Sequence, residues 1–378
     1  MEYRKMERLG ISTSLLGFGC MRFPTTPEGA IDEVRATSML EEAMAAGVNY
    51  IDTAYPYHNG ESEPFVGRAL KKYERGSYYL ATKLPVWLVK ERADVKRIFE
   101  EQLCRLQTDY IDFYLMHAMG KGRFDEMKGL GVIEELEQLK QQGKIRYLGF
   151  SFHDSYEAFE EILTYRDWDF CQIQYNYMDT EEQAGDRGYA LCEKLNVPLI
   201  IMEPVKGGSL AAFSEDIRAK FTAARPDRSV ASWALRWVAS KPQVKVVLSG
   251  MSTEEQVRDN LSTFAEFEPL SAAELAVVEE VVKEVKTRIN VGCTACRYCM
   301  PCPFGIDIPR NFAIWNQYGM YQNVGEARWN YLLNMKPEER ADQCKKCGKC
   351  ETVCPQHLPI REKLAAMAAE FRSLEQGL

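Results

Sequence analysis

The sequence predicts an α/β chain in which a (β/α)8 barrel, or TIM barrel, is followed by a small, mostly helical domain. Two observations predict the barrel: eight short apolar segments recur between residues 15 and 249, and amphipathic helical segments separate them. A third observation predicts the second domain, because eight of the twelve cysteines lie beyond residue 292. The chain has 378 residues, more than one ordinary domain, which suits this division.

The predicted strands are rich in β-branched and aromatic residues, as expected for strands buried on both faces. Helical patterns such as residues 34–47 and 132–143 lie between them, and Gly143 suits the position just after a helix. Eight such units in about 250 residues are typical of this barrel. In chain order the strands cover residues 15–19, 48–52, 78–83, 110–117, 144–150, 170–174, 197–202 and 244–249.

An open doubly wound sheet is the alternative fold, and it would carry the pattern G-x-G-x-x-G after its first strand. Here the first strand ends in GFGCMRF, which lacks the third glycine and opens no immediate helix. We therefore favour the barrel and place it at residues 1–270. A connecting helix is predicted at 271–289, where Ser271 and Glu274 form a capping-box pattern. The second domain then covers residues 290–378.

The clustered cysteines form two arrays, C-x2-C-x2-C-x2-C-P and C-x2-C-x2-C-x3-C-P. The second array has the spacing of bacterial iron–sulfur ligands, so two [4Fe–4S] clusters in a ferredoxin-like domain are predicted. In two-cluster ferredoxins the fourth cysteine ligates the neighbouring cluster, which predicts that Cys354 joins the first array and Cys302 the second. The predicted ligands are Cys293, Cys296, Cys299, Cys302, Cys344, Cys347, Cys350 and Cys354.

Zinc is the alternative metal, because four-cysteine zinc sites also use C-x2-C pairs. Zinc does not require a third and a fourth cysteine within the same short segment, and both arrays have them. A single cluster, with the other array structural or zinc-bound, is also compatible with the sequence. Segments 308–322 and 360–374 have helical periodicity, so the domain is expected to be mostly helical.

Composition limits the partners. The net charge of −8 argues against nucleic acid, and no apolar run is long enough for a membrane-spanning helix. The N-terminus lacks the apolar region of a signal peptide, so the clustered cysteines are interpreted as metal ligands in a reducing cytoplasm. The remaining cysteines are expected to be small core residues: Cys20, Cys104, Cys171 and Cys192.

Ionisable residues stand at the ends of three consecutive predicted strands, where such barrels carry their chemistry. Asp52, Lys83 and His117 end these strands, and Tyr57 follows Asp52 in the next loop. A phenol has a pKa of about 10, and a neighbouring ammonium lowers it while a carboxylate holds the ammonium in place. With an imidazole to orient a carbonyl oxygen, this set suits protonation of a carbonyl as a hydride arrives from a cofactor.

The segment VNYIDTAYPYHNGESE, followed by ATK and YLMH, resembles the aldo/keto reductases over about residues 3–266. The cysteine tail resembles that of the subgroup with a C-terminal ferredoxin-like domain. The resemblance implies an oxidoreductase that reduces a small-molecule carbonyl, or oxidises an alcohol, with NADPH or NADH. It implies that Tyr57 is the proton donor, that Lys83 and Asp52 tune it, and that His117 positions the substrate.

The same resemblance implies a set of cofactor contacts. The sequence departs from the family pattern at two of the cofactor positions. Met202 replaces the tyrosine that usually stacks on nicotinamide, and Ser252 replaces an arginine that would bind the 2′-phosphate of NADPH. Little discrimination between NADPH and NADH is therefore expected. The implied contacts are Gly19, Met21, Ser151, Gln172, Pro204, Gly250, Gln256 and Asn260.

Three alternatives stay open for the clusters. Iron–sulfur clusters pass single electrons whereas nicotinamide moves a hydride, so FMN in the barrel would link the two and would make the protein an electron-transfer reductase. The chain would then have a protein electron donor or acceptor as partner. Alternatively, the barrel is a scaffold for redox sensing, or the clusters are purely structural.

Overall fold

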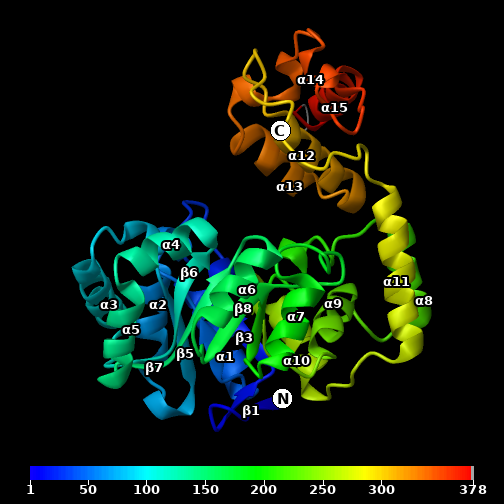
Figure 1. Ribbon diagram of the computed structural model, residues 1–378. Helices are drawn as coiled ribbons and strands as arrows, with labels where there is room; N and C mark the ends of the chain where they lie inside the picture. Colours follow the sequence, from blue (N-terminus) through cyan, green and yellow to red (C-terminus); the bar gives the residue numbers. More distant parts are fainter. Residues whose placement is uncertain (376–378) are drawn as a thin grey trace. The chain divides into compact units, whose positions relative to one another are not determined.

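In residues 1–375, which the computed structural model describes, eight parallel strands form a closed barrel (Figure 1). Each strand lies within two residues of its predicted position, so the predicted fold is confirmed. Neighbouring strands follow chain order, and the last strand pairs with the first to close the barrel. The strands are β3 (Leu16–Gly19), β4 (Tyr50–Asp52), β5 (Tyr79–Leu84), β6 (Ile111–Met119), β7 (Ile145–Phe152), β8 (Phe170–Gln174), β9 (Leu199–Met202) and β10 (Val244–Gly250).

Amphipathic helices surround the barrel, and several begin at a side-chain cap. Asp32, Ser155 and Thr253 each accept a hydrogen bond from a backbone N–H of the first turn, which satisfies a donor that the helix leaves unpaired. The helices are α1 (Glu33–Ala45), α2 (Ser62–Leu70), α3 (Arg92–Leu106), α4 (Lys121–Gly129), α5 (Val132–Gln141), α6 (Tyr156–Tyr165), α7 (Gly185–Lys194), α9 (Val230–Ala239) and α10 (Glu254–Ala265).

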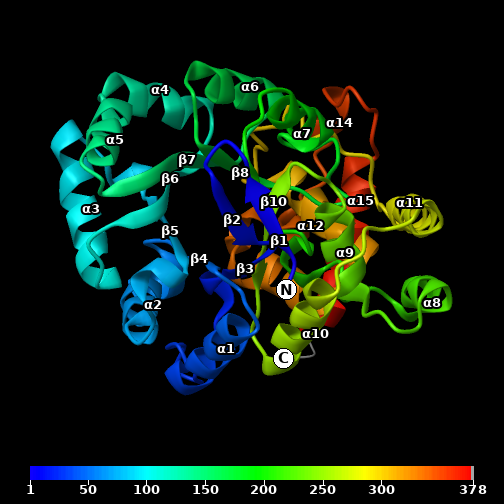
Figure 2. The same cartoon turned by 90° about the horizontal axis from the view of Figure 1, so that it is seen from below.

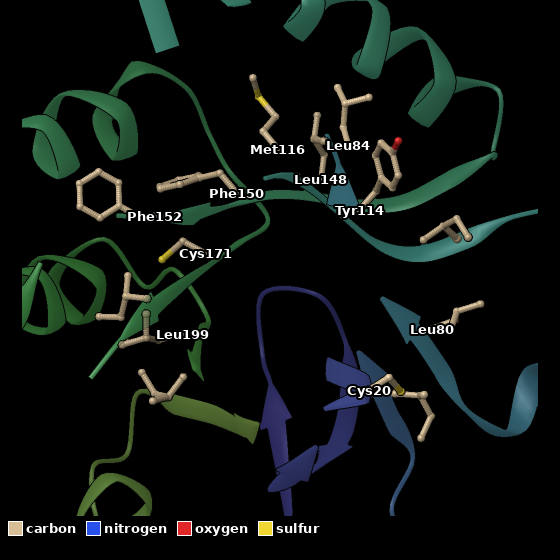
Figure 3. Close-up of a cluster of buried hydrophobic side chains, with 14 of the residues drawn as sticks. Cys20, Leu80, Leu84, Tyr114, Met116, Leu148, Phe150, Phe152, Cys171 and Leu199 are labelled. Carbon is tan, nitrogen blue, oxygen red and sulfur yellow. The ribbon is translucent and has the colours of Figure 1, made fainter. Parts of the chain in front are cut away.

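The two faces of each strand have different surroundings, because successive side chains of a strand point to opposite sides. Outward side chains such as Tyr114, Met116 and Phe150 belong to the core between strands and helices (Figure 3). Inward side chains such as Phe113 and Phe170 fill the barrel. Because the interior is filled, room for chemistry exists only at the barrel ends.

An antiparallel hairpin of β1 (Tyr3–Met6) and β2 (Ile11–Ser14) precedes the barrel and was not predicted. Seen from below, the hairpin lies across the barrel at the N-terminal ends of the strands (Figure 2). Met6 is fully buried and belongs to the same apolar cluster as the barrel interior. The hairpin therefore closes the end opposite the predicted catalytic residues.

We expect Met6→Ala to destabilise the barrel by about 2–4 kcal/mol, because it removes a buried side chain and leaves a cavity. Urea denaturation followed by tryptophan fluorescence measures the change. Val34→Ala is the matched control: Val34 is 82% exposed, so its loss should change the free energy of unfolding by no more than about 0.5 kcal/mol. Equal stability of the two variants would show that the hairpin does not seal the barrel.

The remaining described residues, 272–375, form a second compact unit together with the segment 208–230. This segment leaves the barrel after β9 and contains α8 (Glu215–Ala224), which lies beside α11 (Ala272–Thr287) (Figures 1 and 2). Polar contacts join the two: Lys220 pairs with Glu284 at 3.1 Å, and Arg225 with Glu274 at 3.0 Å. The sequence-based boundaries at 270 and 290 stay a prediction, and they do not include this excursion.

The second unit is mostly helical, as predicted, and has its own apolar core. Phe312, Trp315 and Phe371 are buried in it, and most of the clustered cysteines pack against it. The loops that carry cysteines are therefore anchored on a folded base. Its further helices are α12 (Ile308–Tyr321), α13 (Val324–Arg328), α14 (Lys349–Thr352) and α15 (Ile360–Glu375).

Candidate active site and cysteine sites

The four predicted catalytic residues meet at the C-terminal ends of β4, β5 and β6. Asp52, Lys83 and His117 continue the inward-facing rows of Tyr50, Ala81 and Leu115, so the two-residue period of a strand directs them to the barrel axis. The register of the strands brings these side chains close together, because Asp52 pairs with Ala81 and Lys83 pairs with Leu115. Tyr57 enters from a short turn, Tyr57–Gly60, that follows β4.

Lys83 is the centre of this group. Its Nζ donates to Asp52 Oδ1 at 2.7 Å, to the Thr53 carbonyl oxygen at 2.8 Å and to the Tyr57 hydroxyl at 3.3 Å. Both Lys83 and Asp52 are almost completely buried. Burial lowers the pKa of Lys83, but the charge of Asp52 and the hydrogen bonds and electrostatic interactions with Asp52 and Tyr57 raise it by more. The side chain is therefore an ammonium at neutral pH.

The Tyr57 hydroxyl is protonated at neutral pH. Burial raises its pKa, and the nearby ammonium of Lys83 lowers it by less, so the net pKa lies above the ordinary value of 10. Lys83 lowers the pKa of Tyr57, as expected from the sequence, but burial of the hydroxyl raises that pKa by more. Such a phenol carries a proton to donate at neutral pH, although its raised pKa makes it a weaker acid than a free tyrosine.

His117 is a neutral imidazole in this site. Burial, together with the positive charges of Lys83 and Arg123 and with His153, lowers its pKa to about 2. Its ring lies 6.2 Å from the Tyr57 ring, centroid to centroid, and 5.1 Å from the Trp87 ring. Within residues 1–375, its Nδ1 atom has no hydrogen-bond partner, so this buried atom is left for a ligand.

A buried polar network below Lys83 was not found from the sequence. Gln102 donates from Nε2 to the Lys83 carbonyl oxygen at 3.1 Å and to Glu63 Oε1 at 2.6 Å, and it accepts from the Tyr114 hydroxyl at 2.6 Å. These side chains are fully buried. The sequence contained one signal of this network: Glu63 lies on the apolar face of α2, and Gln102 lies on the apolar face of α3. The network holds the backbone that carries Lys83.

The predicted cofactor residues surround the same end of the barrel. Gly19, at the end of β3, pairs with Gly250, at the end of β10. Met21 follows in the short helix η1 (Cys20–Arg22) and is 56% exposed, and Pro204 follows β9. A side chain at Gly19 would come within 3.1 Å of the Ser249 carbonyl oxygen, so these strand ends approach each other closely.

Ser151 and Gln172 lie on neighbouring strands with their side chains directed inward. Ser151 Oγ accepts a hydrogen bond from the Ala118 N–H at 2.8 Å. Gln172 contacts Met202 Sδ through Nε2 at 3.4 Å, and within residues 1–375 its buried Oε1 has no partner. A buried amide with a free acceptor fits a ligand that donates from an amide of its own, such as the carboxamide of nicotinamide.

Gln256 and Asn260, on α10, are engaged within the chain. Gln256 Oε1 accepts from the Ser252 N–H at 2.7 Å, and Asn260 Nδ2 donates to Ser249 Oγ at 2.8 Å. Both therefore shape the loop that follows β10. Their direct contact with a cofactor stays a prediction.

Two spaces in the second unit are bordered by the clustered cysteines. The first is lined by Cys293, Cys296, Cys299 and Cys354. The second is lined by Cys302, Cys344, Cys347 and Cys350 and also by Cys299, which therefore lines both. The fourth cysteine of each array thus lines the same space as the first three of the other array. The assignment of these thiols to two clusters stays a prediction.

In residues 1–375, no three His, Cys, Asp or Glu side chains converge closely enough to hold a single metal ion. The cysteine spacing, and not this geometry, favours [4Fe–4S] clusters over zinc.

The four other cysteines behave differently from one another. Cys20, Cys171 and Cys192 are buried in the apolar core, as expected. Cys104 is exposed, so its predicted core position is wrong. It lies on α3, whose buried face is formed by neighbours such as Phe99. The helical period turns residue 104 outward.

Comparison with known proteins agrees with this geometry. Residues 15–283 match the model of the aldo/keto reductase family, and residues 292–358 match that of a 4Fe-4S dicluster domain. The L-galactose dehydrogenase of Arabidopsis thaliana is 27% identical over 315 residues, covering 76% of this chain and 96% of the relative. The NADH-specific methylglyoxal reductase of Escherichia coli (strain K12) is 25% identical over 300 residues, covering 68% and 89%.

Solved structures give the same result. The holo form of an aldo-keto reductase from Bacillus halodurans has a TM-score of 0.61 at 29% identity, covering 74% of this chain and 96% of its own. An aldo-keto reductase from Klebsiella pneumoniae in complex with NADPH has a TM-score of 0.62 at 25% identity, covering 75% and 96%. Within residues 1–375, none of the helices has the length and apolarity needed to span a membrane.

Proposed function

The chain belongs to the aldo/keto reductase family and is an oxidoreductase with a C-terminal 4Fe-4S domain, and we propose that it reduces a small carbonyl compound with NADPH or NADH. The reverse reaction would oxidise the corresponding alcohol. Tyr57 is the proposed proton donor. One observation carries the proposal: Lys83 Nζ lies within hydrogen-bond distance of both the Tyr57 hydroxyl and Asp52.

The roles of the side chains follow from their charges. The bound nicotinamide would supply the hydride to the carbonyl carbon, and Tyr57 would donate its proton to the carbonyl oxygen, giving the alcohol. The Lys83 ammonium would stabilise the phenolate that Tyr57 becomes, while Asp52 balances the buried positive charge. The neutral His117 would hydrogen-bond the carbonyl oxygen and orient it.

The cofactor would lie at the C-terminal end of the barrel, where Gln172, with its unpaired buried oxygen, would hold the nicotinamide amide beside Ser151. An NADPH-bound neighbour supports a nicotinamide cofactor. FMN is the second candidate, favoured by Met202 in place of the stacking tyrosine and by the one-electron chemistry of clusters. A protein electron donor or acceptor would then be a partner.

The second unit would hold two [4Fe–4S] clusters, one on each set of four cysteines. Thiolates that hold clusters must stay reduced, and clustered thiols form disulfides under oxidising conditions. We therefore propose a reducing compartment, the cytoplasm, for the protein.

Anaerobic purification followed by assays of iron, sulfide and released cofactor tests the proposal, together with oxidation of NADPH or NADH in the presence of methylglyoxal and other small carbonyls. We expect about eight irons with acid-labile sulfide, no released flavin and carbonyl-dependent nucleotide oxidation. Released FMN with no binding of either nicotinamide nucleotide would favour the electron-transfer reductase instead.

We expect kcat for carbonyl reduction to stay constant from about pH 5 to about pH 9 and to fall only at alkaline pH. Tyr57 must be protonated to act, and its pKa is raised above the ordinary value. His117, with a pKa of about 2, stays neutral over this range. The measurement is kcat against pH in one constant-ionic-strength buffer. An inflection near pH 6.5 that disappears in His117→Asn would contradict the assigned charge of the imidazole.

A further inference from the structure

Arg22 extends across the C-terminal end of the barrel, beside the loops that follow β9 and β10. These are the seventh and eighth strands of the closed sheet. Its side chain lies directly on Gly250: a Cβ atom at that glycine would come within 2.7 Å of Arg22 Cγ. Its Nη2 lies 3.5 Å from the position of a Cβ at Gly207, in the turn after β9. Ser252 Oγ donates to the Arg22 carbonyl oxygen at 2.8 Å and fixes its backbone.

The other cations on these loops are neutralised by carboxylates. Lys206 Nζ lies 2.6 Å from both oxygens of Asp179, and Arg258 Nε lies 3.1 Å from Glu42 Oε1. Arg22 is exposed and has no hydrogen bond or ion pair through its guanidinium with any residue in the range 1–375. Of these three cations in the described part of the chain, Arg22 is therefore the one whose positive charge is not balanced by a carboxylate.

We infer that Arg22 binds a phosphate group of the dinucleotide. The loops after strands 7 and 8 of such barrels form a phosphate site, and a guanidinium matches phosphate oxygens in shape and charge. Glycines at 207 and 250 leave the side chain room to lie between these loops. Position 252 is a serine that binds the Arg22 backbone, so the positive charge comes from the loop after β3.

This inference rests on the proposed use of NADPH or NADH, and direct binding tests it without a substrate. Titration of the full-length protein with each reduced nucleotide, followed by nucleotide fluorescence, gives the Kd. We expect Arg22→Met to raise Kd by about 10- to 100-fold, as for loss of a charged hydrogen bond, and Arg22→Lys to recover part of the affinity. An equal loss for both nucleotides assigns the contact to the pyrophosphate, and a loss for NADPH alone assigns it to the 2′-phosphate.

Arg258→Met is the matched control, because it removes a guanidinium of the same region that is already paired with Glu42. Its Kd for both nucleotides should equal that of the unmodified protein. An unchanged Kd in Arg22→Met for both nucleotides would overturn the inference while leaving the proposed function intact. If the unmodified protein bound neither nucleotide, the proposed function would fail and this inference with it.

Discussion

Tyr57→Phe is expected to lower kcat for carbonyl reduction by about 10²- to 10⁴-fold, the usual cost of losing general acid catalysis. The substitution removes only the hydroxyl that Lys83 contacts at 3.3 Å and keeps the ring that packs beside His117. The fold and the affinity for the nicotinamide nucleotide should therefore not change. Steady-state kinetics and nucleotide titration measure the two quantities separately.

Two further variants make this prediction specific. Tyr55→Phe is the matched control, because Tyr55 lies two residues earlier and directs its hydroxyl to Glu101 rather than to Lys83. It should keep nearly full activity. Lys83→Met should also lower kcat, and its combination with Tyr57→Phe should cost far less than the product of the single effects, since both act on one proton. An unchanged rate in Tyr57→Phe would mean that a flavin or the clusters, and not Tyr57, carry out the chemistry.

Cys354→Ser is expected to remove one whole cluster, about four of about eight irons, and that cluster should be the one on the first array. The structure places Cys354 beside Cys293, Cys296 and Cys299 although it belongs to the second array in sequence. Iron and sulfide are measured after anaerobic purification. Cys104→Ser is the control, because this exposed free cysteine lies on α3 of the barrel and should leave the iron content unchanged.

Paired substitutions decide which thiols share a cluster. If Cys354 serves the first array, the combination of Cys354→Ser with Cys293→Ser removes a single cluster, and about four irons stay. Cys354→Ser with Cys347→Ser then removes both. If instead the first combination removes both clusters and the second removes only one, each array holds its own cluster. Metal content of one zinc per array without sulfide would contradict the cluster assignment altogether.

The barrel was predictable because its signals are local. Strands buried on both faces form short apolar runs, and amphipathic helices between them show the period of 3.6 residues, so each strand was located to within two residues. The hairpin of β1 and β2 lacked such a signal. Its strands have four residues each, and the apolar side chain that matters, Met6, is buried against strands far along the chain. The packing of residues 208–230 with α11 is likewise a long-range contact.

For the candidate site, the sequence by itself determined the residue types, their places at strand ends and the cysteine spacing, because strand period and ligand spacing are properties of neighbouring residues. Only the tertiary structure decided that Lys83 reaches both Asp52 and Tyr57 and that burial raises the pKa of Tyr57. It also decided that Arg22 lies over Gly250. Distances, desolvation and charge compensation depend on which distant segments meet, and that is set by the closure and register of the barrel and by the packing of helices.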